Sequence, residues 1–190
     1  MSKQLLLICS ISFVLVSCKS VNHNCSENLL LNYKNDKYKV FVDDFPNNQL
    51  DFKYLFDYTE EREGVFYDDK GYEMINYFFS RSPKTSDYLT IVKSVEICIG
   101  LENWDADNIN FFQKGTFQYV LSYPNEFISE IEKHSEKSQR KFWHFLLTSS
   151  YETENETTKQ KYLVLYKTVS SLSKKQTSYI QEEYYDIYDL

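Results

Sequence analysis

The sequence contains few of the residues that make tight turns. Its 190 residues include only four glycines and three prolines. A β-sandwich needs such residues at each of its many turns, so their scarcity argues against that class and favours helices joined by polar loops. The composition therefore predicts an all-α fold.

Recognisable catalytic motifs are also absent from the sequence. It has no GxGxxG, no Walker-type phosphate loop and no GxSxG elbow, and its three histidines stand in no HExxH pattern. Residues 102–108 begin like a calcium loop, but Asn110 stands where a glycine should make the sharp turn and Thr116 where a glutamate should close the cage. We therefore expect no metal, no cofactor and no enzymatic activity.

The charge balance is acidic. The chain has 21 basic and 28 acidic side chains, a formal charge of −7 at pH 7. Such a surface repels phosphates, which argues against nucleic acid and anionic lipid as partners. Tyrosine is abundant while Ala106 is the only alanine, a bias typical of an AT-rich genome. The 17 tyrosines are therefore not by themselves evidence for a binding surface.

The first eighteen residues have the features of a bacterial export signal. Lys3 supplies a positive start, and residues 5–16 form a mostly apolar stretch. A membrane-spanning helix needs about 20 apolar residues, whereas polar residues follow this stretch directly after Cys18. A signal peptide is therefore favoured over a membrane-spanning helix.

The end of this stretch, Leu15-Val16-Ser17-Cys18, resembles the lipobox of bacterial lipoproteins. The resemblance implies a diacylglycerol on the Cys18 thiol and cleavage before Cys18. It also favours the outer membrane, because Lys19 stands where an Asp would mark inner-membrane retention. No acidic export signal follows, so the periplasmic face is expected. The alternative is an ordinary signal peptide in which Cys18 is incidental.

The chain divides into three predicted parts. Residues 1–17 are the signal peptide, residues 18–36 an Asn- and Ser-rich lipidated tether, and residues 37–190 a single helical domain with a possible short strand near residues 38–42. The amphipathic segments after Leu50 resemble the helical hairpins of HEAT-like α-solenoids. Since no repeat period is visible, a globular helical bundle fits equally well.

Two predicted helices give specific expectations for the core. The predicted helix that ends at Gly100 has a stripe of residues at helical spacing that should face the core: Leu89, Val92, Glu96 and Ile99. In the other, which Ser135 caps, four bulky residues cannot share one face, so at least three should lie between helices: Phe142, Trp143, Phe145 and Leu146.

Two cysteines remain after lipidation and processing. Cys25 and Cys98 can form a disulfide in an oxidising periplasm. Alternatively Cys98, which lies in an apolar run, is a buried thiol that behaves as a small hydrophobic side chain. The sequence leaves both possibilities open.

The C-terminal segment is the candidate binding site. It combines three tyrosines, Tyr184, Tyr185 and Tyr188, with Asp186 and Asp189. Tyrosine offers a large contact area with few rotamers to freeze, and acidic neighbours steer a basic partner. The segment therefore predicts a protein partner with a basic surface. The alternative is that the tyrosines only pack the last helix onto the domain.

These observations together predict a membrane-anchored lipoprotein with a non-catalytic protein-binding domain, of an immunity type or an adaptor of an envelope complex. An envelope enzyme with an unrecognised site and a structural or assembly lipoprotein remain as alternatives.

The lipobox gives the first testable prediction. Cys18 should be the acylated N-terminus of the mature protein, because the motif directs lipid transfer and then cleavage at this residue. Mass spectrometry of the intact, detergent-extracted protein measures this directly. A free Cys18 thiol, or a chain that still begins at Met1, would contradict the prediction.

Overall fold

The computed structural model describes residues 23–59, 62–81, 88–101, 107–148 and 155–188. Within these ranges the fold is all-α, as the composition predicts. The elements in chain order are α1 (His23–Lys34), α2 (Tyr38–Asp44), α3 (Gln49–Phe56), β1 (Tyr58–Thr59), β2 (Arg62–Glu63), α4 (Asp69–Phe78), α5 (Tyr88–Cys98), α6 (Asp107–Ser122), α7 (Pro124–Ile131), α8 (Glu136–Leu147), α9 (Asn155–Val169) and α10 (Lys174–Tyr188).

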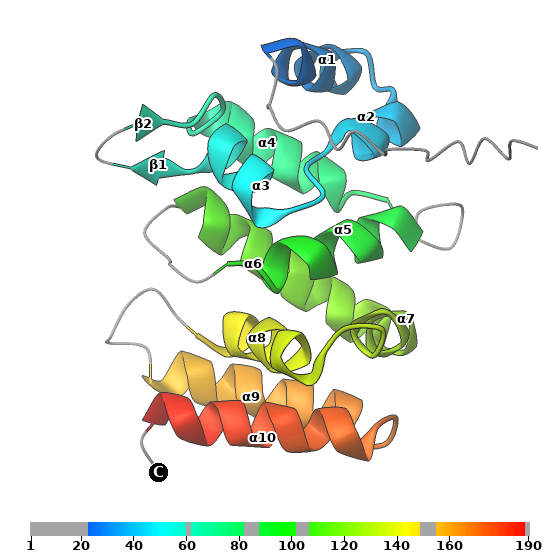
Figure 1. Ribbon diagram of the computed structural model, residues 1–190, viewed down its shortest axis with the longest axis vertical. Helices are drawn as coiled ribbons and strands as arrows, with labels where there is room; N and C mark the ends of the chain where they lie inside the picture. The colour runs from blue at the N-terminus through cyan, green and yellow to red at the C-terminus, as the bar shows by residue number, and fades with distance from the viewer. Residues whose placement is uncertain (1–22, 60–61, 82–87, 102–106, 149–154, 189–190) are drawn as a thin grey trace, which may run out of the picture.

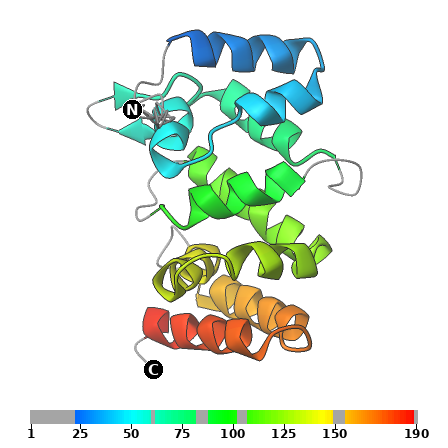
Figure 2. The same cartoon turned by 45° about the vertical axis from the view of Figure 1, so that its right-hand side comes forward.

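The helices are stacked along the long axis of the molecule in the order of the chain (Figure 1). α1 and α2 lie at one end and α9 and α10 at the other, as a second view also shows (Figure 2). Each even-numbered helix from α2 to α10 packs against the next even-numbered one, and α3, α5 and α7 follow each other in the same way. This two-layered packing is that of a short α-solenoid, one of the two expected architectures.

Aromatic rings fill the core of the N-terminal half. Phe45, in the loop between α2 and α3, stacks on Phe78 of α4 with ring centroids 4.0 Å apart. The same ring lies 5.5 Å from Phe56 of α3 and 6.3 Å from Phe112 of α6. One loop residue thus joins three helices through stacked rings, a geometry that contributes about 0.5–1.5 kcal/mol per pair beyond the buried area.

The core of the C-terminal half is centred on α8. All four of its bulky residues, Phe142, Trp143, Phe145 and Leu146, are buried, which confirms the expectation of at least three. The indole Nε1 of Trp143 donates a hydrogen bond to Oε1 of Gln176 on α10, at 2.8 Å. Gln176 in turn donates from Nε2 to Oε1 of Gln139, at 2.7 Å. This buried chain of hydrogen bonds fixes α10 on α8.

The predicted apolar stripe of α5 is wrong. Leu89, Val92, Glu96 and Ile99 are only half-buried. The fully buried apolar residues of this helix are Ile91, Val95, Ile97 and Cys98. α5 lies in the middle of the stack and packs against α2, α3, α7 and α8, so it is enclosed on most sides. Because apolar residues occur on several of its faces, the sequence does not single out the buried one.

The possible strand near residues 38–42 is also wrong, because these residues lie in α2. Tyr38, Phe41 and Val42 are buried with the helical spacing i, i+3, i+4. Among the described residues the strands β1 and β2 form a short antiparallel hairpin, in which Tyr58 pairs with Glu63 and Thr59 with Arg62.

The folded domain begins earlier than expected. Residues 23–34, predicted to belong to the tether, form α1, which packs against α2. Leu29 of this helix is fully buried. The tether prediction is therefore wrong for this part, because Leu29 of the apolar patch at residues 29–31 gains free energy by burial on the domain.

Lys93 connects α5 to the end of α2. Its Nζ donates hydrogen bonds to the backbone carbonyl of Asp43, at 2.8 Å, and to that of Phe45. Burial lowers the pKa of Lys93 from 10.5 to about 8, although the nearby carboxylates of Asp43 and Asp44 act in the opposite direction.

The α8 core gives the second prediction. Phe145→Ala should lower the free energy of unfolding by about 3–5 kcal/mol, because it removes a ring that is only 1% exposed and leaves a cavity. Leu50→Ala is the control, since Leu50 is 76% exposed and its loss should change stability by no more than about 0.5 kcal/mol. Urea unfolding followed by circular dichroism measures both. Equal effects of the two substitutions would contradict the placement of Phe145.

The third prediction concerns pH. Between about pH 8 and pH 10.5, folded Lys93 has released a proton that the unfolded chain still binds, so its contribution to stability rises with pH over this window. Lys93→Met removes this titration. The free energy of unfolding of the wild type, minus that of Lys93→Met, should therefore increase between about pH 7.5 and pH 9.5 in urea titrations. A difference that is constant or decreases over this interval would refute the assignment.

Candidate functional site

The tyrosines predicted to bind a partner lie at the contact between the last two helices. The ring of Tyr184 is half-buried and stacks on Tyr162 of α9, with centroids 4.0 Å apart and an interplanar angle of 14°. Tyr162 also contacts Tyr166, at 5.6 Å, and Tyr184 contacts Tyr185, at 5.8 Å. The four side chains form a continuous tyrosine row across α9 and α10, consisting of Tyr166, Tyr162, Tyr184 and Tyr185.

The residues of this segment differ in burial. Ile180 is fully buried and Tyr184 half-buried, so these two pack the last helix. Tyr185 and Asp186 are exposed and face solvent. The side chain of Tyr188 and the whole of Asp189 lie outside the described residues.

The outer side of α9 is unusually apolar for the end of a solenoid. Leu163 is 47% exposed and Val164 41% exposed, next to the exposed Tyr166 of the tyrosine row. α9 packs against α8 and α10. Terminal pairs of a solenoid normally present a polar outer face, because nothing else keeps their apolar side chains out of water. This end of the stack therefore has the composition of a contact surface.

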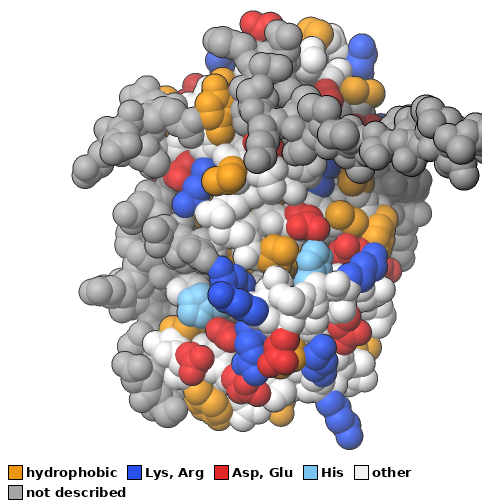
Figure 3. Space-filling model, in the orientation of Figure 1, with side chains coloured by type: hydrophobic (Ala, Val, Ile, Leu, Met, Phe, Trp, Pro, Cys, Tyr) orange, Lys and Arg blue, Asp and Glu red, His pale blue; other side chains and the backbone are white. Residues whose placement is uncertain are grey.

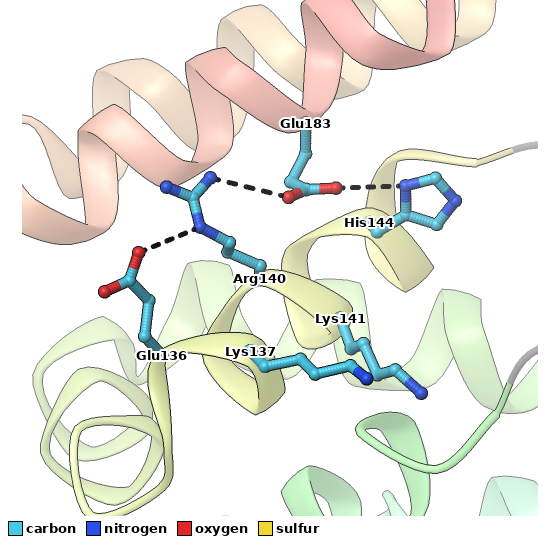
Figure 4. Close-up of a pocket in the computed structure, with 6 residues that line it drawn as sticks. All are labelled: Glu136, Lys137, Arg140, Lys141, His144 and Glu183. Atoms are coloured by element: carbon cyan, nitrogen blue, oxygen red, sulfur yellow. Dashed lines mark hydrogen bonds and ion pairs between the residues drawn. The ribbon is translucent and has the colours of Figure 1, made fainter.

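An open pocket of about 530 Å³ lies between α8 and α10 (Figure 4). Six side chains line it: Glu136, Lys137, Arg140, Lys141, His144 and Glu183. Basic, acidic and histidine side chains gather over the part of the surface where Figure 1 places these two helices (Figure 3). We call this the α8 pocket.

Arg140 is the centre of an ion-pair network in the α8 pocket. Its Nε lies 3.2 Å from Glu136, and its Nη1 lies 2.5 Å from Glu182 and 3.7 Å from Glu183. The guanidinium also lies over the ring of Tyr179, 4.4 Å from its centroid. The network holds Arg140 in one orientation and ties α8 to α10.

The acidic residues of the network are engaged within the protein. Hydrogen bonds from Ser178 and Arg140 lower the pKa of Glu182. Glu183 is buried, and its second carboxylate oxygen lies 3.1 Å from Nδ1 of His144. The acidic character expected to attract a basic partner therefore rests, among the described residues of α10, on the exposed Asp186.

The two lysines of the pocket are oriented differently. Lys137 and Lys141 extend side by side, away from Glu183 (Figure 4). No hydrogen bond or ion pair connects Lys137 to another residue in the described part of the chain. The α8 pocket thus contains a compensated ion-pair network on one side and, on the other, two lysines, of which Lys141 takes part in an interaction within the protein.

The sequence analysis missed this pocket, although part of its signal is visible. Lys137, Arg140, Lys141 and His144 follow the spacing i, i+3, i+4, i+7 and therefore lie on one face of the predicted helix. The contribution of Glu183, 39 residues beyond His144, is visible only in the folded chain.

Cys98 is a free, buried thiol whose Sγ lies 3.9 Å from Oγ1 of Thr116. Burial raises its pKa well above the ordinary value, which disfavours the reactive thiolate. The side chain of Cys25 and the whole of Cys18 lie outside the described residues. Pairing of Cys25 with Cys98 therefore stays a prediction.

Residues 102–106 of the calcium-like run 102–108 also lie outside the described ranges. Elsewhere in the described chain, no three His, Cys, Asp or Glu side chains are grouped so that they could hold a metal ion. None of the described helices is long and apolar enough to cross a membrane.

Comparison with known proteins gives no relative: no protein-family model matches the chain, and neither curated proteins nor solved structures contain a significant match.

Proposed function

We propose that this protein is a lipid-anchored, non-catalytic protein-binding module of the bacterial envelope, held on the periplasmic face of the outer membrane. The observation that carries this proposal is the exposed tyrosine row with Leu163 beside it, at an end of the solenoid that no described helix covers. Exposed tyrosines beside aliphatic side chains are typical of protein interfaces, where they contribute much of the binding energy.

The position of the lipid supports this assignment. Only residues 19–22 separate Cys18 from the start of α1 at His23. Five residue steps span at most roughly 18 Å, so a lipid on Cys18 would keep the α1 end of the stack close to the bilayer. Because the helices are stacked in chain order, α9 and α10 would then be the end farthest from the membrane (Figure 1). A partner in the periplasm could reach this end.

The fourth prediction tests this surface. The double variant Tyr166→Ala/Tyr185→Ala should reduce capture of the native partner from envelope extracts at least tenfold, because exposed tyrosines at the centre of an interface contribute about 2 kcal/mol or more each. Quantitative mass spectrometry of crosslinked, affinity-purified protein measures the captured amount. The melting temperature of the variant should stay close to that of the wild type, since both rings are exposed.

Tyr67→Ala is the matched control, because Tyr67 is as exposed as Tyr185, 43% against 41%, but precedes α4 near the other end of the stack. The control should capture the partner as the wild type does. Equal capture by the double variant and the control would remove the support for this binding surface.

A further inference from the structure

A smaller pocket lies between α4 and α6, which occupy the part of the stack between α1 and α8 (Figure 1). It has a volume of about 200 Å³ and is lined by six residues: Asn76, Phe79, Phe111, Lys114, Gly115 and Gln118. The four residues from α6 follow the spacing i, i+3, i+4, i+7 and therefore lie on one face of that helix. We call this the α4–α6 pocket.

Two half-buried phenylalanines form the apolar walls of the α4–α6 pocket, and neighbouring rings hold both of them in place. Phe111 lies edge to face with Tyr72, with ring centroids 4.6 Å apart. Phe79 contacts Phe112 at 5.4 Å and Tyr119 at 5.1 Å. Such contacts restrict the movement of the rings, so the walls are preformed and little conformational entropy is lost when a ligand enters.

Gly115 determines how closely one of these walls approaches α6. A Cβ atom at this position would collide with Cδ2 of the Phe79 ring. The absence of a side chain at Gly115 therefore allows the ring to lie directly against the backbone of the helix. The pocket is consequently bounded by two rings and by a stretch of α6 that has no side chain of its own.

The polar side chains of the α4–α6 pocket are exposed to solvent. They belong to Asn76, Lys114 and Gln118, and no hydrogen bond or ion pair engages these side chains in the described part of the chain. The described residues that line the pocket include no acidic side chain. The pocket thus combines one uncompensated ammonium group and two amide groups with two aromatic walls.

We propose that the α4–α6 pocket binds a small aromatic carboxylate, a molecule with a single ring and one acid group. The ring lies against Phe79 and Phe111, and the carboxylate pairs with the ammonium group of Lys114. The side-chain amides of Asn76 and Gln118 donate hydrogen bonds at the same rim of the pocket. This inference does not depend on the proposed function, because the pocket shares no residue with the surface on α9 and α10.

Size and charge together select this class of ligand. Pockets for drug-sized molecules have volumes of about 300–1,000 Å³, so the α4–α6 pocket admits little more than one ring with a short substituent. Lys114 would repel a cationic ligand, and no carboxylate among the described lining residues would attract one. A phosphate ester fits less well than a carboxylate, because phosphate is bound best by the paired donors of an arginine and the pocket offers one lysine.

The fifth prediction tests the pocket with hydrocinnamate, a phenyl ring on a three-carbon acid, as the probe. The chain contains only four glycines, so selective labelling of glycine with nitrogen-15 gives four backbone amide signals in a nuclear magnetic resonance spectrum. Titration of the full-length protein in neutral detergent should shift the Gly115 signal in a saturable manner. The signals of Gly64 and Gly100, which do not line the pocket, should stay in place.

Lys114→Gln should weaken hydrocinnamate binding roughly threefold or more, because it removes the charge that pairs with the carboxylate at an exposed position. The same variant should bind the uncharged amide of the probe as the wild type does. Lys137→Gln is the matched control, because Lys137 is also an exposed lysine without a partner in the described chain but does not line this pocket. The control should bind hydrocinnamate with wild-type affinity, and both variants should keep the wild-type melting temperature.

Several outcomes would overturn the inference. One is the absence of a saturable shift at Gly115 in the wild type, and another is equal weakening in Lys114→Gln and Lys137→Gln. Equal shifts of all four glycine signals would show only that the probe enters the detergent. Equal affinity for the cyclohexyl analogue of the probe would contradict an aromatic ligand. Tighter binding of N-acetylphenylalanine, which imitates the C-terminus of a protein, would assign the pocket to a protein chain instead of a small molecule.

Capture of the native partner separates this inference from the proposed function. If hydrocinnamate does not bind but the tyrosine row captures a specific partner, the inference fails while the proposed function stands. If the wild type captures no partner, the proposed function fails irrespective of the hydrocinnamate titration.

Discussion

Every helix pair of this stack can bury its apolar side chains only against the pairs before and after it, and the rest of the structure follows from this constraint. In the interior the constraint is met by aromatic rings that bridge successive layers, as Phe45 does between α3, α4 and α6. Between α8 and α10 it is met by Trp143, whose indole N–H is satisfied by Gln176 of the last helix. A buried indole N–H without an acceptor would lower the free energy of unfolding. The hydrogen bond to Gln176 therefore favours the one position of α10 on α8 in which it can form.

The same constraint explains the exposed apolar side chains of the last helix pair. The last pair has no following neighbour among the described helices, so the outer side of α9 leaves Leu163 and Tyr166 exposed. The ring of Tyr184, in contrast, is stacked on Tyr162 and is thereby partly removed from water. The tyrosine row thus has inner members, Tyr162 and Tyr184, that hold the two helices together and outer members, Tyr166 and Tyr185, that remain exposed to solvent.

Sequence patterns predicted the helices wherever one face is buried and the other exposed. α7 and α8 are such cases, and the sequence also marks where they begin. Pro124 is the first residue of α7, and Ser135 caps α8 by accepting a hydrogen bond from the backbone N–H of Ser138. The patterns failed where that contrast is missing. α5 is enclosed on most sides and has no single apolar stripe, and α2 is too short for its period to outweigh its β-branched valines. α1 was missed because its polar composition hides Leu29, the residue that anchors it.

Some features of the candidate site can be predicted from the sequence alone and others cannot. Exposure of Tyr185 and Asp186 follows from their position on α10, and the basic stripe of α8 is visible as a helical spacing. The charge that this surface presents to its surroundings is not visible in the sequence, because it depends on pairs such as Arg140 with Glu182, which lie 2.5 Å apart only when α8 is packed on α10. Counting acids along α10 therefore overestimates its negative charge.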